Sequence, residues 1–445
     1  MSGIADFIKL VYHRRFAGKA KIEAYQLSQL KTLIEFAKEH SAYYNETLAD
    51  LEMRSLNDIK KLPIINKDLM MTHFDRLNTV GLKKAEVMAV AVEKELNKDY
   101  LGYYKDEFVI GLSSGTSGNK GLYITPKALT ERLPFVFLAR SGIPLRYLPF
   151  KILFMLRVFS QGFNDINSPF ISLNYLSTMT EPEEIIRQIN QRKINILMAP
   201  PSLCRMLIPL AHRIRKPLKM IVTYAEVLEK EEKIRLNEVF DCRVIEIYQG
   251  SEGQFASACP LGNLHINEDL IFVELLDENY KDITQPHVAA THMIATNLVN
   301  QAQPLIRYEM NDLIVLDDPC PCGSHFRTIE KILGRNDDIL YFKKKDGSIQ
   351  HIFPDLFSRW IITSSENIRE YKVIQQADHS ITILLDPIMI REQVELVQQV
   401  HSRIQTELAA VDIESRMDIR CETITLPANR AKYKRFEVDK DIAKH

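Results

Sequence analysis

A run of hydroxyl and glycine residues near residue 115 could bind phosphate. Residues 113–121 read Ser-Ser-Gly-Thr-Ser-Gly-Asn-Lys-Gly. Glycines let backbone N–H groups approach an anion closely, the hydroxyls add donors, and Lys120 adds a positive charge. The kinase-type and ATPase loop Gly-x-x-x-x-Gly-Lys-[Ser/Thr] is absent, because Gly121 follows Lys120. A flexible linker has a similar composition, but this run lies between two apolar segments. The sequence therefore favours a strand–loop–strand unit that binds a triphosphate or pyrophosphate.

Further polar residues follow apolar runs. The segment 248–253, Tyr-Gln-Gly-Ser-Glu-Gly, presents a ring, a hydroxyl and a carboxylate on one turn. Tyr248 could stack on a purine and Glu252 could hold Mg²⁺ beside a triphosphate. Residues 223–228 also end a strand and could form another wall of a nucleotide pocket. Asp312 follows an apolar run, and an Asp there can accept both ribose hydroxyls. Taken one at a time, each segment is equally consistent with an ordinary turn.

Three cysteines and one histidine have spacings that suggest a metal site. Cys259 and His265 lie six residues apart, and Cys320 and Cys322 lie on one turn. A Cys₃His set is typical of closed, tetrahedral, structural zinc. The Cys-x-Cys spacing is tighter than the usual Cys-x₂-Cys, and reduced side chains in loops are the alternative. The remaining cysteines lie in helical or strand contexts and are expected in the core: Cys204, Cys242 and Cys421.

Length and composition limit the class of protein. A chain of 445 residues is long for one core, so two or more domains are expected. A net charge of −1 gives no general attraction to nucleic acid or anionic membranes. No apolar run approaches a membrane span, and six cysteines do not make a disulfide framework, so a cytoplasmic location is expected. Residues 1–16 do not resemble a signal peptide; they suggest an amphipathic helix that caps the core, with membrane contact as the alternative.

Short apolar runs alternate with helical patterns between about residues 107 and 250. This rhythm predicts a parallel sheet covered by helices on both faces, with ligands at the carboxyl ends of its strands. Beyond about residue 340 the pattern changes to a small α+β unit that ends in a basic segment, 427–436. The expected strands are 151–157, 194–198, 220–223, 244–248, 370–376, 381–385 and 417–424, and the expected helices are 181–192, 201–214, 228–240 and 388–410.

Five segments stand in one order along the chain: 113–121, 248–253, 307–312, 334–338 and 427–432. Together they resemble the signature series of the adenylate-forming superfamily, which includes acyl-CoA synthetases, peptide-synthetase adenylation domains and luciferases. The phenylacetate–CoA ligase-like branch is similar through Pro304-Leu-Ile-Arg-Tyr308, Ala199–Ser202, Leu264–Glu268 and Cys320–Gly323.

This resemblance implies an α/β fold with two domains. Residues 1–336 would form a large N-terminal domain, with parallel-rich sheets covered by helices, that binds ATP and a small carboxylic acid. Residues 337–445 would form a small, mobile α+β domain, with Asp337 as the hinge. An acyl-AMP and pyrophosphate would form first. A thiol of coenzyme A or of a carrier protein's pantetheine arm would then attack.

The resemblance also implies residue roles. Lys432, five residues after Pro427, matches the mobile catalytic lysine, although Lys434 and Arg435 lie close by. Ser251 would lie near the α-phosphate and Glu252 on Mg²⁺. The residues that would contact ATP are Ser113, Ser114, Gly115, Thr116, Ser117, Gly118, Lys120, Ala225, Glu226, Tyr248, Gly250, Asp312 and Arg335. Residues 159–170, 199–202 and 224–227 are expected to form the acid pocket. Ligands similar to the Cys₃His set occur in some relatives, and the zinc would brace loops near the site.

Departures from the family pattern leave the second half of the reaction open. Asn119 stands where proline is frequent, Gln249 follows Tyr248, and residues 343–348 are not the usual glycine-rich acceptor loop. The acceptor is therefore coenzyme A, a carrier-protein thiol, or no thiol at all. One alternative function is transfer of AMP to the hydroxyl of a deazaflavin coenzyme. A second, of another class, is a non-catalytic nucleotide-binding protein. The sequence does not indicate the acid or the oligomeric state.

Overall fold

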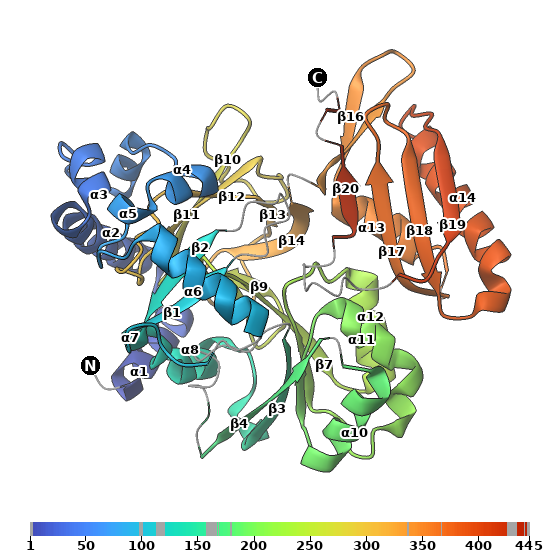
Figure 1. The fold of residues 1–445 in the computed structure, drawn as a ribbon, viewed down its shortest axis with the longest axis horizontal. Coiled ribbons are helices and arrows are strands. Elements are labelled where there is room, and N and C mark those ends of the chain that lie inside the picture. The colour runs from blue at the N-terminus through green and yellow to red at the C-terminus, as the bar shows by residue number, and fades with distance from the viewer. Residues whose placement is uncertain are drawn as a thin grey trace.

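The computed structural model describes residues 3–97, 101–112, 121–156, 167, 169–178, 180–335, 338–365, 367–424, 434–439 and 441–442. Residues 3–335, here called the N-terminal body, carry a nine-stranded sheet and two smaller ones, and residues 338–442, here called the C-terminal unit, carry a four-stranded sheet and a two-stranded one (Figure 1). The α/β fold predicted from the sequence is confirmed. No helix of the described chain is long and apolar enough to cross a bilayer.

The N-terminal body begins with a layer of helices. Its longest member, α2, buries Ile22, Gln26, Leu30, Leu33, Ile34 and Ala37. This spacing of three and four residues places one stripe of the helix against the sheets. The helices are α1 (Gly3–Arg15), α2 (Lys19–His40), α3 (Ala42–Thr47), α4 (Lys67–Thr72), α5 (Phe74–Leu77) and α6 (Lys84–Asn97).

A nine-stranded sheet runs through the N-terminal body in the order β13-β14-β9-β8-β7-β6-β5-β3-β4. The strands β3 to β7 pair in parallel, and the remaining pairs of this sheet are antiparallel. Their bounds are β3 (Phe150–Leu156), β4 (Ile171–Ser177), β5 (Ile196–Met198), β6 (Met220–Thr223), β7 (Arg243–Gly250), β8 (Gly253–Ala258), β9 (Leu264–Ile266), β13 (Asp312–Leu316) and β14 (Thr328–Arg335).

Helices cover both faces of the parallel strands, as predicted. Leu153, Leu197 and Ile221 point to α10 (Pro182–Arg192), α11 (Pro201–Leu207) and α12 (Lys230–Phe240). Their strand neighbours Ile152 and Val222 belong to the opposite cluster, which packs against α8 (Leu133–Arg140). The alternation follows from the two-residue period of a strand.

Two smaller sheets complete the N-terminal body. The strands β1 (Phe108–Leu112) and β2 (Leu122–Pro126) pair antiparallel, with Leu112 opposite Leu122, on either side of the predicted phosphate loop. This confirms the two strands that the flanking apolar runs predicted. The other sheet contains β10 (Ile271–Leu276), β11 (His292–Asn297) and β12 (Tyr308–Met310).

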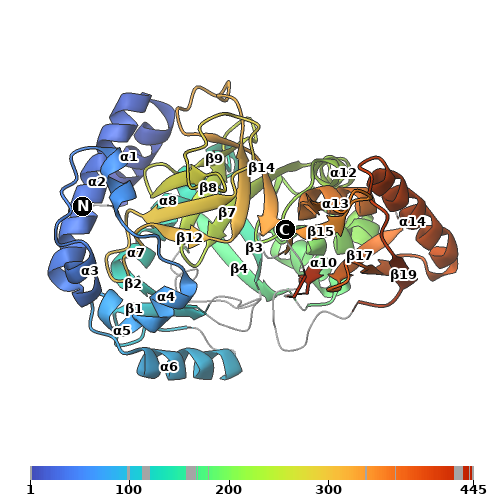
Figure 2. The same ribbon diagram turned by 90° about the horizontal axis from the view of Figure 1, so that it is seen from above.

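The C-terminal unit has its own core and lies at the opposite end of the molecule from the N-terminal helices (Figure 2). A hairpin, β15 (Leu340–Lys343) and β16 (Ile349–Ile352), precedes α13 (Pro354–Ile362). A four-stranded sheet follows in the order β19-β18-β17-β20, with α14 (Gln393–Ala409) beside it. Its strands are β17 (Ile368–Gln375), β18 (Ile381–Pro387), β19 (Met417–Cys421) and β20 (Phe436–Val438). The predicted helix 388–410 begins later than expected, because residues 390–392 form a 3₁₀ turn.

Candidate active site

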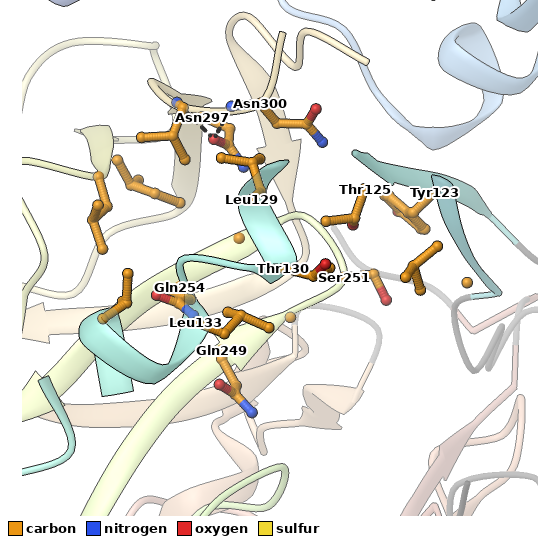
Figure 3. Close-up of a pocket in the computed structure, with 18 of the residues that line it drawn as sticks. Tyr123, Thr125, Leu129, Thr130, Leu133, Gln249, Ser251, Gln254, Asn297 and Asn300 are labelled. Atoms are coloured by element: carbon orange, nitrogen blue, oxygen red, sulfur yellow. Dashed lines mark hydrogen bonds between the residues drawn. The ribbon is translucent and has the colours of Figure 1, made fainter. Parts of the chain in front are cut away.

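A cavity of about 390 Å³ opens beside the end of β7. Its walls come from β1 and β2, from the chain around α7 (Lys127–Thr130) and α8, from the turn between β7 and β8, and from residues 297–300. Figure 3 shows side chains from these separate elements facing one space. The polar residues on the walls include Thr125, Thr130, Gln249, Ser251, Gln254, Asn297 and Asn300. The cavity is thus partly apolar, with amides and hydroxyls at several points, as ligand sites commonly are.

The turn between β7 and β8 is tight because two glycines pair across it. Gly250 lies opposite Gly253 in the hairpin. A Cβ atom on Gly253 would lie 2.5 Å from Cδ1 of Ile271, so a larger residue would force a shift there. Asn297 Nδ2 donates to the carbonyl of Glu252 at 2.7 Å and fixes the turn. Ser251 and Glu252 are therefore held at the tip of a tight hairpin beside the cavity.

The carboxylate of Glu252 is held by a buried tyrosine. Tyr123 of β2 donates its hydroxyl to Oε1 of Glu252 at 2.7 Å, and the hydroxyl of Tyr308 lies 3.1 Å from that of Tyr123. Burial and the Glu252 charge raise the pKa of Tyr123 well above its ordinary value, so Tyr123 keeps its proton and acts as a donor. This arrangement orients one carboxylate oxygen of Glu252.

Two residues predicted to contact the nucleoside meet directly. The hydroxyl of Tyr248 donates to Oδ2 of Asp312 at 2.6 Å. The Tyr248 ring stacks on Phe255 with 4.9 Å between ring centres and 25° between planes. Asp312 begins β13 and lies opposite Arg335 in the register of β13 and β14. Residues 248, 312 and 335, far apart in the sequence, are therefore brought together, and Gln249 and Gly250, which follow Tyr248, line the cavity.

The loop after β6 holds the other predicted wall. Tyr224 lines the cavity, and its hydroxyl donates to the carbonyl of Met155. Ala225 has φ of 67°, in the left-handed region that alanine rarely adopts. Such strain is maintained only where the surrounding contacts require it. Glu226 accepts hydrogen bonds from the backbone N–H of Ser202 at 3.0 Å and from its hydroxyl at 2.7 Å, which ties two segments of the expected acid pocket together.

Several predicted site residues lie outside the described residues. These are Ser113, Ser114, Gly115, Thr116, Ser117, Gly118, Lys120, Asp337 and Lys432, together with most of the expected acid-pocket segment 159–170. Arg335 is placed by its backbone alone. Leu112 is the last residue of β1 and Leu122 is the first residue of β2, so the two residues flank the predicted phosphate loop. Other residues of both strands line the cavity.

Sequence reasoning missed the amide side chains on the cavity wall. Asn297 ends the buried strand β11 and Asn300 follows it, and a polar pair at the end of such a strand is a signal that could have indicated them. Thr130 and Gln254 carried no such signal.

The four predicted metal ligands gather at one point. The sulfurs of Cys259, Cys320 and Cys322 and a ring nitrogen of His265 all lie within 4.8 Å of one another. The ring nitrogen Nδ1 of His265 is bonded to the carbonyl of Phe326 at 2.8 Å, which leaves Nε2 directed to Cys322 at 3.5 Å. Burial lowers the pKa of His265 to about 4, so its ring is neutral.

Backbone and amide groups support the thiols of this cluster. Asn263 Nδ2 donates to the sulfur of Cys320 at 3.1 Å, and the N–H of Leu261 donates to that of Cys259 at 3.3 Å. Such donors stabilise metal-bound thiolates, and a His whose second nitrogen bonds a carbonyl is a frequent ligand. The donor set therefore fits a closed four-coordinate ion.

The fold is similar to that of solved acyl-CoA ligase structures. No protein-family model and no curated protein matches the sequence. A solved structure of 2-hydroxyisobutyryl-CoA ligase, in the post-adenylation state with its acyl-AMP, is similar with a TM-score of 0.71 and 15% identity, over 96% of this chain and 92% of that one.

Two further structures have the same architecture. The same ligase with acyl-AMP and CoA, in the thioesterification state, gives a TM-score of 0.59 at 15% identity over 96% of this chain and 91% of that one. An anthranilate–CoA ligase bound to anthranoyl-AMP gives 0.54 at 17% identity over 73% and 66%. At these identities the likeness shows the fold.

Proposed function

We propose that the chain is an ATP-dependent ligase that joins a carboxylic acid to AMP, releases pyrophosphate, and then passes the acyl group to a thiol. The observation that carries this proposal is that Ser251 lines the cavity, Glu252 is hydrogen-bonded to Tyr123 of its wall, and Tyr248, at the start of the same hairpin segment, is hydrogen-bonded to Asp312. The acceptor would be coenzyme A or a carrier-protein thiol. Within the fold, we propose the phenylacetate–CoA ligase-like branch from the motifs in the sequence.

The contacts support a separate role for each of these residues. Asp312 would accept the ribose hydroxyls beside Tyr248, whose ring would border adenine. Ser251 would lie near the α-phosphate at the rigid hairpin. Glu252, oriented by Tyr123, would hold the Mg²⁺ that accompanies ATP and neutralises its phosphates. The carboxylic acid would occupy the cavity, with its carboxylate oxygen toward the α-phosphorus.

The division of the chain at residue 336, with Asp337 as hinge, belongs to the same proposal. Lys432 would donate to the α-phosphate oxygens as negative charge develops on them, and would leave when the C-terminal domain rotates. Arg335, beside Asp312 in the sheet, and the wall residues Ala225 and Glu226 complete the proposed set.

Pyrophosphate release tests the proposal. The purified chain is incubated with ATP, Mg²⁺ and a panel of aryl and aliphatic carboxylic acids, with Asp312→Ala as the matched inactive variant. We expect one acid class to support release by the parent chain, and a thioester to follow when coenzyme A or a phosphopantetheinylated carrier is added. An AMP adduct on a deazaflavin hydroxyl would select the adenylyltransferase instead. Nucleotide binding with no pyrophosphate from any acceptor would select the non-catalytic protein.

We also propose that Cys259, His265, Cys320 and Cys322 bind one structural zinc ion. The gathered donor atoms and their N–H···S supports carry this proposal. The ion would join the turn after β8 to the turn at residues 320–323. Metal analysis should find about one zinc per chain in the parent and in Cys204→Ser, a control outside the cluster, and almost none in Cys320→Ser. Equal zinc in the parent and Cys320→Ser would refute the site.

A further inference from the structure

Five charged side chains meet where the C-terminal unit touches the N-terminal body, and we call them the charge cluster. Their exposed fractions run from 5% for Glu232 to 23% for Glu226. Charged side chains are seldom buried to this degree unless they are paired. The members are Arg205 in α11, Glu226 after β6, Glu232 in α12, Glu370 in β17 and Arg435 just before β20.

Glu370 is the centre of the charge cluster. It accepts two hydrogen bonds from Arg435, from Nε at 2.8 Å and Nη2 at 3.1 Å, and a third from Nη2 of Arg205 at 3.0 Å. Burial would raise the pKa of Glu370, but the two arginines lower it below its ordinary value, so the carboxylate is charged. One carboxylate therefore binds an arginine from its own unit and another from the N-terminal body.

The charge cluster can be divided without leaving an arginine unpaired. Arg435 and Glu370 both belong to the C-terminal unit. Within the N-terminal body, Nη1 of Arg205 donates to Oε1 of Glu232 at 2.5 Å. Three contacts of the described cluster residues join the two units: Arg205 with Glu370, Arg205 with the carbonyl of Arg369 at 3.5 Å, and Arg435 with Glu226 at 3.5 Å. Breaking a buried pair is costly mainly because a lone buried charge is left. On opening, Arg435 keeps Glu370, Arg205 keeps Glu232, and Glu226 keeps its hydrogen bonds from Ser202, so the joint can open at limited cost.

The charge cluster adjoins the segment that carries the proposed catalytic lysine. Arg435 is three residues beyond Lys432, and Lys434 Nζ lies 2.9 Å from Oδ1 of Asp338, next to the proposed hinge. On the body side, Glu226 follows Tyr224 and the strained Ala225 on the cavity wall. The contact therefore links the flank of the lysine segment to the wall of the acid and nucleotide site.

We propose that the charge cluster is a releasable joint that holds the C-terminal unit in the orientation that serves acyl-AMP formation. Arg205 and Arg435 are its positioning residues, and the inference rests on the proposed ligase function. The comparison of states agrees with this assignment. The same neighbouring ligase matches this chain with a TM-score of 0.71 in its post-adenylation state and 0.59 in its thioesterification state.

A double variant tests the joint. Arg205→Gln/Glu232→Gln removes one neutral pair from the body side, and with it the contact of Arg205 with Glu370, while Arg435 keeps Glu370 and Glu226. The matched control is Arg359→Gln/Glu231→Gln, because this pair also joins the two units, at 2.7 Å, but its side chains are 57% and 35% exposed. Small-angle scattering of the full chain without ligands reports the relative placement of the units. Melting temperatures check that each variant is folded.

Two kinetic measurements separate the half-reactions. With the acid found for the parent, we expect pyrophosphate release by the double variant to fall roughly tenfold, with KM for ATP unchanged. Thioester formation from supplied acyl-AMP should stay equal or rise, because the unit is freer to turn. The control should match the parent in both.

The outcomes distinguish the joint from the ligase proposal. The joint is supported if the double variant, but not the control, has a larger maximum dimension in scattering than the parent. This result would support the joint even if no acid releases pyrophosphate in the parent and the ligase proposal fails. Identical scattering of parent and double variant overturns the joint. So does an equal loss in both half-reactions.

Discussion

The N-terminal helices and the C-terminal unit pack against the same body by different means. The helices share one large apolar cluster with the sheets, in which Leu33 and Ile34 of α2 join Phe255, Ile266 and the strands β10 to β12. Most of the buried apolar residues of the C-terminal unit form a cluster of their own. Among the described residues, the apolar cluster that spans the junction is small: Leu313, Val315, Leu333 and Ile339.

This difference indicates which contact is permanent. Separating the helices from the sheets would expose buried apolar surface at about 25 cal/mol per Å². Separating the C-terminal unit would mainly divide the charge cluster into the pair Arg435 and Glu370 and the group Arg205, Glu232 and Glu226. The first interface therefore holds the body together, and the second is suited to open in the proposed reaction.

Arg307 should be the most sensitive charged residue of the permanent interface. Its guanidinium donates to Glu274 at 2.9 and 3.0 Å and to the carbonyl of Lys60 at 3.1 Å. Arg307→Met leaves Glu274 buried and unpaired, so the free energy of unfolding should fall by about 3–5 kcal/mol. Urea unfolding followed by circular dichroism measures this loss. A loss below about 1 kcal/mol would contradict the assignment.

Ile34→Ala should have the next largest effect. Ile34 is fully buried in the shared apolar cluster. Its truncation should cost about 3 kcal/mol from lost burial and the cavity left behind. The chain has one tryptophan, Trp360, buried in the core of the C-terminal unit, so its fluorescence reports that unit. Circular dichroism should show an earlier transition while Trp360 fluorescence changes little; coincident shifts in both signals would argue against separate interfaces.

Asp312→Ala should weaken ATP binding by roughly tenfold, because it removes the proposed ribose acceptor and the partner of Tyr248. Asp318→Ala is the control, since that carboxylate is 71% exposed. Titration calorimetry with ATP and Mg²⁺ measures the affinities. Because Asp312 and Tyr248 both belong to the N-terminal body, Arg205→Gln/Glu232→Gln should bind ATP as the parent does. Equal affinities of Asp312→Ala and the parent would remove Asp312 from the nucleotide site.

Arg359→Gln should have the smallest effect. This arginine pairs with Glu231 across the two units, but in water-exposed surroundings. Exposed pairs contribute little, so the free energy of unfolding should change by less than about 0.5 kcal/mol. Denaturation with Trp360 as the probe tests this. A loss of unfolding free energy comparable with that of Arg307→Met would show that the burial of an ion pair does not determine how much the pair contributes to stability.

The sequence predicted those parts of the fold that local pattern determines. Buried runs such as Met220–Thr223 have the period and composition of a central parallel strand, and the strand occupies those residues. The cysteine and histidine spacing likewise indicated which side chains gather. In these cases the chemistry of neighbouring residues carries the information.

Other contacts depend on how distant segments fold together. Tyr248 and Asp312 are 64 positions apart, and no spacing rule implies the 2.6 Å contact between them. Arg205, Glu232 and Glu370 resemble solvent-facing charges on amphipathic elements. They are buried only because the C-terminal unit covers α11 and α12 (Figure 1).

The two strands that flank residues 422–435 belong to one sheet. Cys421 of β19 lies opposite Leu385, and Leu385 lies opposite Tyr371, while Phe436 of β20 lies opposite Val373. The chain thus leaves the sheet at Cys421 and rejoins it at Phe436 near the same end, on its two outer strands. In the proposed mechanism, a turn of the C-terminal unit would therefore carry both ends of the segment that contains Lys432 together.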